Sequence, residues 1–374
     1  MIQPIPRHRE ISRQLLAEIA EKKFASSGRI PSEAQLVKRF GVSRPTISRA
    51  LRDLQADGLI ERRAGSGTYL KGAGKTPPTA RQLGLLVPER GSTEILELVC
   101  GELSSLARAN DYALLFGGAS LPSQEGDMND AHSLAMCDHF IEQQVMGVFF
   151  APFEAIANRT EINQRIAGSL AKAGIPVVLL DRDTATFPSR SEMDLVATDN
   201  FAGGFMAAEH LIKLGSRRIA FVARPAHAPT VDARIAGARE ALLRHGLQIA
   251  DDWIQIGVPE NVPFVRSKIA GRGWDALVCA NDLTAAQIMR SLEKCEVKVP
   301  RDLRVVGFDD AKYATLLGVS LTTVHQPCRD LAIAAFRAIR DRIAEPALPT
   351  RGFLLTPRLV VRESCGAYLS GEKP

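Results

Sequence analysis

The chain has 374 residues, of which 45% are hydrophobic and 24% charged, a composition typical of a globular protein and not of a disordered or fibrous one. A single hydrophobic core rarely organises so long a chain, so the length predicts two or three domains. The charge is uneven, because residues 1–75 hold 15 Lys and Arg against 7 Asp and Glu, whereas the remainder holds 32 against 35. A basic segment joined to a slightly acidic body favours contact between the N-terminal part and a polyanion.

Cysteine usage and hydropathy exclude several other classes. The six cysteines are widely spaced, and none forms a Cys-x-x-Cys pair or stands next to a histidine. We therefore expect free thiols in a reducing cytoplasm, with no disulfide framework, metal site or cofactor. The N-terminus lacks the apolar core of a signal peptide, and no run of about 18 apolar residues occurs, so we expect a cytoplasmic protein without membrane contact.

The first predicted elements are two helices. Residues 9–22 place apolar side chains at helical spacing, namely Ile11, Leu15, Leu16 and Ile19. Ser32 is the expected N-cap of a second helix, with Gln35 three residues later as its capping-box partner. Gly41 ends that helix, whose inward side chains are Leu36, Val37 and Phe40.

A third helix follows at once. Ser43 caps it, Pro45 stands in its first turn, and the helix is expected from Arg44 to about Asp57, before Gly58. Its predicted buried stripe consists of Ile47, Ala50, Leu51 and Leu54. That rotation exposes a polar line made by Arg44, Ser48 and Arg52, with Arg49 beside it. Guanidinium groups pair with guanine edges or clamp phosphates, and hydroxyl groups such as that of Thr46 add contacts.

Two short strands, at residues 59–63 and 68–70, complete this unit, joined by Ala64-Gly65-Ser66-Gly67. A Gly-rich connection lets backbone N–H groups approach a phosphate closely. Packing alone does not require an arginine-rich helix face and a basic hairpin, so the pattern favours a winged helix-turn-helix that reads double-stranded DNA. The candidate DNA-binding residues are Ser43, Arg44, Thr46, Ser48, Arg49, Arg52, Gly65, Ser66 and Gly67.

Residues 4–72 resemble the winged helix of GntR-family bacterial transcription regulators. The resemblance rests on Pro-Ser-Glu (31–33), Gly-Val-Ser-Arg-Pro-Thr (41–46), Ala-Leu-x-x-Leu (50–54), Asp-Gly-Leu-Ile (57–60) and Gly-x-Gly-Thr (65–68). It implies DNA contacts at Ser43, Arg44, Thr46, Gly65 and Gly67. Position 48 is Ser where relatives usually carry Arg, and position 34 is Ala, so the operator sequence of relatives is not expected here.

Residues 73–81 form a Gly- and Pro-rich linker between a predicted DNA-binding domain, residues 1–72, and a second domain, residues 82–374. The linker begins within Gly-Ala-Gly-Lys-Thr, which is similar to the end of a phosphate-binding loop. Tyr69 stands where such a loop needs glycine, and Pro77-Pro78 prevents the helix that must follow. We therefore reject a nucleotide site at this place.

From residue 82 onward, short apolar strands alternate with helices. Strands are expected at 83–87, 113–116, 147–150, 177–180, 196–198, 218–223, 276–279 and 303–308, and helices at 95–109, 200–214, 235–245 and 283–294. This alternation predicts an α/β fold with parallel sheets covered by helices on both faces. The two sets, separated near residue 198, indicate two doubly wound lobes.

Polar residues follow four of these strands, as Asp181-Arg182-Asp183, Asp199-Asn200, Asn281-Asp282 and Asp309-Asp310. Strand ends of this fold gather at a ligand cleft, and such side chains suit a small polyhydroxylated ligand. Asp and Asn after a strand also cap the next helix. Pure capping is expected for Asp199 and Asn200 and is one interpretation of Asp282.

Residues 82–370 resemble the effector domain of LacI-type repressors and of periplasmic sugar-binding proteins. The motifs are Asp-Asn-x-x-Gly-Gly with its following helix and strand (199–222), Arg-x-x-Gly-x-x-Glu-Ala-Leu (234–242), Val-Val-Gly-Phe-Asp-Asp (305–310) and Leu-Thr-Thr-Val-His-Gln-Pro (321–327). The resemblance implies effector contacts at Asp181, Arg182, Arg234, Asn281, Asp309 and Gln326. It also implies three crossings between the lobes, so that lobe 1 holds about 82–197 and 326–345, and lobe 2 about 198–325 and 346–368.

The combination resembles AraR-like regulators, in which a GntR reader is fused to a sugar sensor. We therefore expect a dimeric, sequence-specific transcriptional regulator that acts as a repressor and is controlled by a sugar or polyol. A sugar-binding receptor without a regulatory role and a corepressor-dependent purine- or nucleoside-type regulator stay open as alternatives. No catalytic residues are expected, since Gly-x-Gly-x-x-Gly, Gly-x-Ser-x-Gly and His-Glu-x-x-His motifs are all missing from the sequence.

Overall fold

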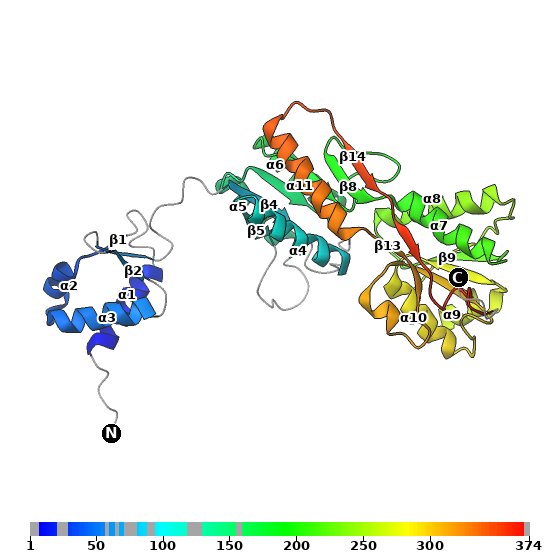
Figure 1. Ribbon diagram of the computed structural model, residues 1–374, viewed down its shortest axis with the longest axis horizontal. Helices are drawn as coiled ribbons and strands as arrows, with labels where there is room; N and C mark the ends of the chain where they lie inside the picture. Colours follow the sequence, from blue (N-terminus) through cyan, green and yellow to red (C-terminus); the bar gives the residue numbers. More distant parts are fainter. Residues whose placement is uncertain are drawn as a thin grey trace, which may run out of the picture. The chain divides into compact units, whose positions relative to one another are not determined.

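The structure is a computed structural model that describes residues 7–20, 29–56, 60–63, 67–70, 81–87, 94–117, 129–154 and 159–369 (Figure 1). The chain forms two compact units, residues 1–80 and 81–374. In the part of the chain that is described, no helix is both long and apolar enough to cross a membrane.

The first unit packs three helices against a small antiparallel sheet. Its elements are α1 (Arg7–Ala20), β1 (Arg29–Ile30), α2 (Glu33–Phe40), α3 (Arg44–Ala56), β2 (Ile60–Arg63) and β3 (Gly67–Leu70). The strand order is β1-β3-β2, and β1 was not predicted from the sequence. The core comprises Ile11, Leu15, Ile30, Leu36, Ile47, Ala50, Leu51, Leu54 and Ile60.

The predicted start and end of α2 are confirmed. The Ser32 hydroxyl accepts a hydrogen bond from the Gln35 N–H, and the Gln35 side chain accepts one from the Ser32 N–H at 2.8 Å. Gly41 takes a left-handed conformation, with φ of 63°, and its N–H donates to the Val37 carbonyl. The wing residues Gly65 and Ser66, the helix stop at Gly58 and linker residues 73–80 lie outside the described residues.

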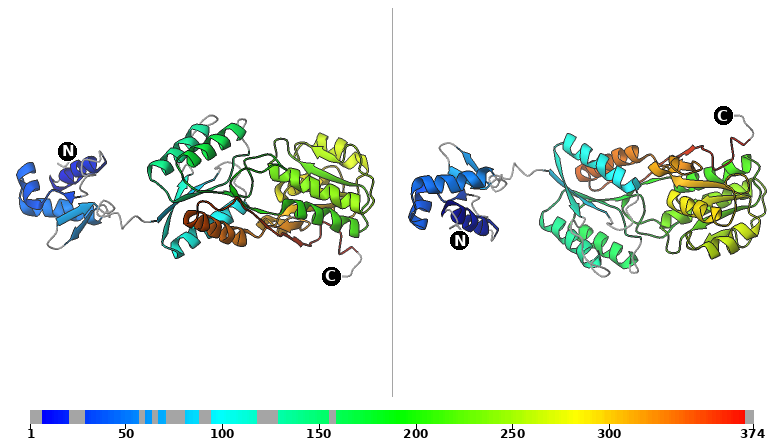
Figure 2. Two further views of the ribbon diagram at one scale, coloured as in Figure 1. Left: turned by 90° about the horizontal axis from the view of Figure 1, so that it is seen from above. Right: turned by 90° about the horizontal axis from the view of Figure 1, so that it is seen from below.

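Lobe 1 of the second unit is a parallel six-stranded sheet with helices on both faces. Its elements are β4 (Arg81–Leu86), α4 (Glu94–Ala109), β5 (Tyr112–Gly117), α5 (Asn129–Glu142), β6 (Gly147–Phe150), α6 (Arg159–Lys172), β7 (Val177–Leu180), β8 (Asp194–Thr198), α11 (Cys328–Ala344) and β14 (Gly352–Leu355). The strand order is β14-β8-β7-β6-β4-β5. Figure 2 shows α5 and α6 on one face of the sheet and α4 and α11 on the other.

Lobe 2 repeats this architecture. Its elements are α7 (Asn200–Lys213), β9 (Ile219–Ala223), α8 (Pro229–Arg244), β10 (Ile254–Ile256), α9 (Val262–Lys268), the short 3-10 helix η1 (Ala270–Arg272), β11 (Ala276–Cys279), α10 (Asp282–Glu293), β12 (Arg304–Asp309), the 3-10 helix η2 (Lys312–Thr315), β13 (Thr322–His325) and β15 (Arg358–Val360). The order is β10-β9-β11-β12-β13-β15, and only β15 pairs antiparallel with its neighbour. Its single core includes Phe221, Trp253, Trp274 and Phe308.

The chain passes between the lobes three times, and one predicted boundary is wrong. The first two passages, at residues 198–199 and 326–327, lie where they were expected. The last was expected near residue 346, but β14 pairs in parallel with β8, so lobe 1 extends to Leu355. The prediction failed because Pro346 and Pro349 mark only the loop before β14, whose edge position gives it no continuous buried run.

Candidate functional site

The α3 helix presents the predicted polar face. Ile47, Ala50, Leu51 and Leu54 are fully buried against the rest of the first unit. On the remaining surface, Arg44, Arg49 and Arg52 are exposed and Ser48 is half-buried. The helix rotation predicted from the apolar spacing is therefore confirmed, and the three guanidinium groups are free of the core.

The start of α3 is held in place by side-chain contacts. The hydroxyl oxygens of Ser43 and Thr46 lie 2.8 Å apart. Nε of Arg44 donates to Oε2 of Glu33, in the first turn of α2, at 3.2 Å. Glu33 thus positions the arginine at the tip of the helix, a role that no sequence motif had indicated.

In the second unit, a cavity of about 330 Å³ lies between the two lobes. All six predicted effector residues line it, namely Asp181, Arg182, Arg234, Asn281, Asp309 and Gln326. Residues that the sequence analysis did not select also line it, among them Glu154, Arg224, His227 and Thr230. The strand-end rule therefore selected residues that line one cavity, and it did not select those on the loops that follow β6 and β9.

Two carboxylates fix Arg182 on the lobe 1 side. The guanidinium is buried and forms an ion pair with Glu154 through Nη1. Its Nε and Nη2 approach Oδ2 of Asp181 at 3.0 and 2.8 Å. Asp181 has a φ of 67°, which is uncommon for a residue with a side chain and typical of strained functional positions.

On the lobe 2 side, Arg234 is buried and tightly oriented. Its Nε donates to Oδ1 of Asn200 at 2.8 Å, and Nη1 donates to the Ala280 carbonyl at 2.6 Å. The guanidinium carbon lies 3.7 Å from the centroid of the Phe308 ring. Burial lowers the pKa of Arg234, an effect that the negative charge of Asp309 opposes. Nη2 makes no hydrogen bond to any described residue, so it is the nitrogen left for a ligand.

Of the two residues expected only to cap α7, one does so and the other does not. Asp199 caps α7, because its side chain accepts from the Ala202 N–H at 2.9 Å. Asn200 does not cap, because its amide holds Arg234 and donates to the Thr198 carbonyl. The expectation of pure capping for Asn200 was therefore wrong, and the reason is a contact with a residue 34 positions away.

Two glycines bring α7 and α8 together and so place Arg234. A Cβ on Gly204 would lie 2.0 Å from the Arg234 carbonyl oxygen, and one on Gly237 would lie 1.9 Å from that of Phe201. No larger side chain fits where two backbones touch. These contacts explain the glycines in both sequence motifs on which the resemblance rests.

Asp309 ends β12 and faces the cavity. Its φ is 124°, and its Oδ1 accepts from Nε2 of Gln326 at 2.8 Å. Burial raises the pKa of Asp309 to about 6, although Arg234 and the Gln326 bond act in the opposite direction. Oε1 of Gln326 accepts from the Thr198 hydroxyl at 2.7 Å. Thr198, Gln326 and Asp309 therefore form one hydrogen-bonded chain across two of the interlobe passages.

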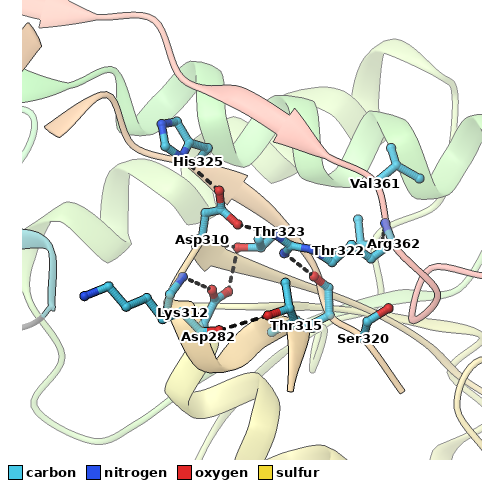
Figure 3. Close-up of polar contacts among 12 residues, drawn as sticks. Asp282, Asp310, Lys312, Thr315, Ser320, Thr322, Thr323, His325, Val361 and Arg362 are labelled. Atoms are coloured by element: carbon cyan, nitrogen blue, oxygen red, sulfur yellow. Dashed lines mark hydrogen bonds and ion pairs between the residues drawn. The ribbon is translucent and has the colours of Figure 1, made fainter. Parts of the chain in front are cut away.

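Behind Asp309 lies Asp282, which does not cap α10, since Asn281 does so by accepting from the Thr284 N–H at 2.8 Å. The fully buried Asp282 carboxylate accepts from the Thr323 hydroxyl at 2.6 Å and from the Ala311 N–H at 2.8 Å (Figure 3). Burial and the charge of Asp309 raise the pKa of Asp282 to about 8.

Asp310 anchors the same strand ends from the other side. Its carboxylate lies 2.9 Å from Nδ1 of His325 and pairs with Arg362 at 2.5 Å (Figure 3). Burial alone would raise the pKa of Asp310, but the hydrogen bonds from Arg362 and His325 outweigh it and lower that pKa. These contacts tie β12, β13 and the segment after β15 together beneath the cavity.

Formal charges around the cavity cancel. Three carboxylates, of Glu154, Asp181 and Asp309, face three guanidinium groups, of Arg182, Arg224 and Arg234. Such a lining offers many hydrogen-bond donors and acceptors without a net field, which suits a neutral ligand rich in hydroxyl groups. Among the described residues, no group of three or more His, Cys, Asp and Glu side chains could hold a metal ion.

Family comparisons give the two units their classes. The family described as bacterial regulatory proteins, gntR family, matches residues 7–70. The family described as periplasmic binding protein-like domain matches residues 208–365. The chain is a GntR-type DNA-binding domain fused to a periplasmic-binding-protein-like domain.

Two curated relatives of this chain are transcriptional repressors. It is 24% identical to the arabinose metabolism transcriptional repressor of Geobacillus stearothermophilus over 370 residues, which are 96% of this chain and 98% of that protein. It is 30% identical to the HTH-type transcriptional repressor PurR of Salmonella newport over 194 residues, which are 51% of this chain and 56% of that protein.

Solved structures agree on the fold. The transcriptional regulator CelR in complex with cellobiose matches with a TM-score of 0.64 and 23% identity, covering 86% of this chain and 91% of that one. A LacI family regulator from Enterococcus faecium with bound ribose matches with a TM-score of 0.60 and 24% identity, covering 76% and 98%. The predicted fold class, the resemblance of both units and the predicted class of DNA-binding regulator with a sensor domain are confirmed.

Proposed function

We propose that the GntR fusion is a repressor whose affinity for operator DNA is set by a small neutral carbohydrate bound between the two lobes. The observation that carries this proposal is the convergence of six strand-end and helix side chains on one charge-balanced cavity, in a chain that also exposes an arginine face on α3. A DNA-binding regulator of the bacterial type would act in the cytoplasm, and the proposal assigns it no catalytic step and no cofactor.

The DNA contacts follow from the exposure of α3. Arg44, Arg49 and Arg52 would enter the major groove, and the hydroxyl groups of Ser43, Thr46 and Ser48 would add contacts to phosphates or base edges. The wing residues Gly65, Ser66 and Gly67 would approach the phosphate backbone through their N–H groups.

A carbohydrate is favoured over a purine by the lining of the cavity. No Phe, Tyr or Trp stands among the described residues that line it, whereas a flat purine ring is usually held by stacking. Asp181, Arg182, Arg234, Asn281, Asp309 and Gln326 would bind ring hydroxyls. Known relatives and neighbours that name arabinose, cellobiose or ribose make a pentose or hexose unit the first choice.

The lobes supply the switch. An effector shifts DNA binding only if it prefers one lobe arrangement over another. Besides the chain through Gln326, a second contact joins the lobes: Glu94 at the start of α4 accepts from the Lys312 N–H at 3.1 Å. Ligand bonds to both walls of the cavity would add to these contacts and favour the closed arrangement.

A homodimer would present two copies of α3 to two half-sites of a palindromic operator. Apolar side chains are exposed on one edge strand of each six-stranded sheet, with Phe116 on β5 and Ile254 and Ile256 on β10. Leu98 and Val258 are exposed as well. Exposed apolar groups on sheet edges support their use as a contact between subunits.

The decisive experiment has two arms. Selection of bound sequences from random duplex DNA, followed by fluorescence anisotropy, tests specific DNA binding, and a thermal-shift screen of pentoses, hexoses and their disaccharides tests the sensor. We expect a selected site whose affinity changes when the stabilising sugar is added. A protein that binds a sugar but selects no DNA sequence would instead be a receptor without a regulatory role, and stabilisation by purines alone would favour the corepressor alternative.

A further inference from the structure

A second cavity, of about 300 Å³, adjoins the effector cavity at the edge of the interlobe cleft. It lies between the loop after β7, the ends of β8 and β14, and the first turns of α7 and α8. Both cavities share Asp181, Arg182 and Thr230 as lining residues. The two cavities are therefore neighbours that have these three residues between them.

The second cavity is chemically unlike the first, because its free surface is apolar. Three large hydrophobic side chains around it are strongly exposed: Phe187 by 41%, Phe201 by 42% and Leu354 by 53%. Leu195 and Ala197 on β8 extend the same wall. Exposed aromatic and aliphatic groups that surround a concavity mark a binding site more often than scattered ones do.

Three charged side chains beside this cavity are already bonded within the protein. Asp183 accepts hydrogen bonds from the N–H groups of Ala185 and Ser191 and from Nε of Arg190. Asp199 caps α7, and Arg182 is paired with two carboxylates. What the cavity offers an additional molecule is therefore apolar contact.

We propose that the effector is a glycoside whose sugar fills the polar cavity and whose apolar aglycone, an aromatic or aliphatic group, fills the second. This inference rests on the function proposed above and adds the class of effector to it. Phe187 and Leu354 belong to lobe 1, and Phe201 belongs to lobe 2. The aglycone therefore contacts both lobes and contributes to closure as well as to affinity.

The test compares matched pairs of ligands on the full-length chain. Isothermal titration calorimetry would measure methyl and phenyl glycosides of arabinose, ribose, xylose, glucose and galactose. We expect a phenyl glycoside to bind at least tenfold more tightly than the methyl glycoside of the same sugar, which is about 1.4 kcal/mol. Equal affinities within the pair would overturn the inference.

Variants test whether the additional affinity of the phenyl glycoside arises at the second cavity. Phe201→Ala and Leu354→Ala should each reduce the phenyl preference by threefold or more and leave the affinity for the methyl glycoside unchanged. Leu316→Ala, at a side chain that is 82% exposed and lines neither cavity, is the control and should keep the full preference. A phenyl preference that survives in both cavity variants would place the aglycone elsewhere and refute the site.

The outcomes also separate this inference from the proposed function. If free sugars or methyl glycosides bind and a phenyl group adds nothing, the carbohydrate sensor stands and only the aglycone site fails. If no sugar or glycoside of either kind binds, the carbohydrate sensor itself fails.

Discussion

Glu33 holds Arg44 at the tip of α3 through a 3.2 Å contact between carboxylate and guanidinium. Arg44 is largely exposed, so the pair adds little to stability, but it restricts where the guanidinium points before DNA arrives. Pre-orientation of a base-contacting side chain lowers the entropy lost on binding.

Arg44→Ala should therefore weaken binding to the selected operator by about 1–3 kcal/mol and reduce discrimination against altered sites. Glu33→Gln should weaken it less, by about 0.5–1 kcal/mol, because the arginine remains but is no longer held. Fluorescence anisotropy measures both, with Gln14→Ala, exposed on α1, as the control. Unchanged discrimination in Arg44→Ala would remove α3 from its role in base recognition.

Effector binding should weaken in acid. The pKa of Asp309 is raised to about 6, so below this pH the carboxyl group is protonated and accepts fewer hydrogen bonds from ligand hydroxyls. The dissociation constant should rise by up to tenfold per pH unit below 6 and be nearly constant above 7.

Glu154 and Asp181 face the same cavity, so the comparison with Asp309→Asn identifies the responsible group. That variant should bind the sugar more weakly at pH 8 and lose the step near pH 6, as measured by calorimetry from pH 5 to 8. DNA binding should persist. A step of unchanged size in Asp309→Asn would assign the titration to another carboxylate.

Stability should fall as pH rises through the range in which Asp282 ionises. Its pKa is raised from 3.8 to about 8, so the folded state favours the protonated form. This contribution is complete below about pH 4 and is lost as pH rises through 8, with a total on the order of several kcal/mol.

Asp282→Asn is neutral at every pH and can keep both contacts, by accepting from the Ala311 N–H and donating to Thr323. In urea unfolding of the second unit, this variant should flatten the pH dependence between 5 and 9 and be more stable than the parent at pH 9. Asp251→Asn, at an exposed position, serves as the control and should retain the parent slope. Parallel slopes for Asp282→Asn and the parent would contradict the assignment.

The contact of α7 with α8 should not tolerate a single methyl group. Gly204→Ala and Gly237→Ala would each place a Cβ about 2 Å from a backbone oxygen, so we expect a loss of about 3 kcal/mol or more. Displacement of Arg234 should also weaken sugar binding. Gly168→Ala, in α6 with no atom within 4 Å of the new Cβ, should instead stabilise by roughly 0.5–1 kcal/mol. Equal effects at all three sites would show that helix propensity, and not the close approach, governs these glycines.

If the chain forms a dimer through the β10 edge, charged substitutions there should halve the molecular mass in solution. Ile254→Asp combined with Ile256→Asp puts two charges on the β10 edge and should yield a monomer in sedimentation experiments. The monomer should bind a two-half-site operator more weakly than the parent. Leu316→Asp, exposed but outside the edge strands, should stay dimeric. A parent protein that is itself monomeric would contradict the proposal.

Local signals were sufficient for the elements that depend on neighbours in sequence. The rotation of α3 followed from the spacing of Ile47, Ala50, Leu51 and Leu54, and the end of α2 followed from Gly41. The strand-end rule placed Asp309 and Arg182 at one cavity, since parallel strands end at one sheet edge.

Long-range contacts were beyond such signals. From the sequence alone Asn200 is interpreted as a helix cap, because its contact with Arg234 depends on the position of α8. The residues of β14 give no strand signal of their own, because their conformation depends on pairing with β8. The apolar cavity beside Phe187 is likewise built from segments that are far apart in the chain. The spacing of residues in the sequence does not predict contacts between segments that are so far apart.

Gln326 spans two passages of the chain with a single amide group. A ligand hydroxyl group that donates to Oδ1 of Asp309 must compete with this amide. Ligand binding would therefore change the contacts at the point where the two lobes are connected. Substitution of Gln326 should therefore alter both the capture of the signal molecule and the connection between the lobes.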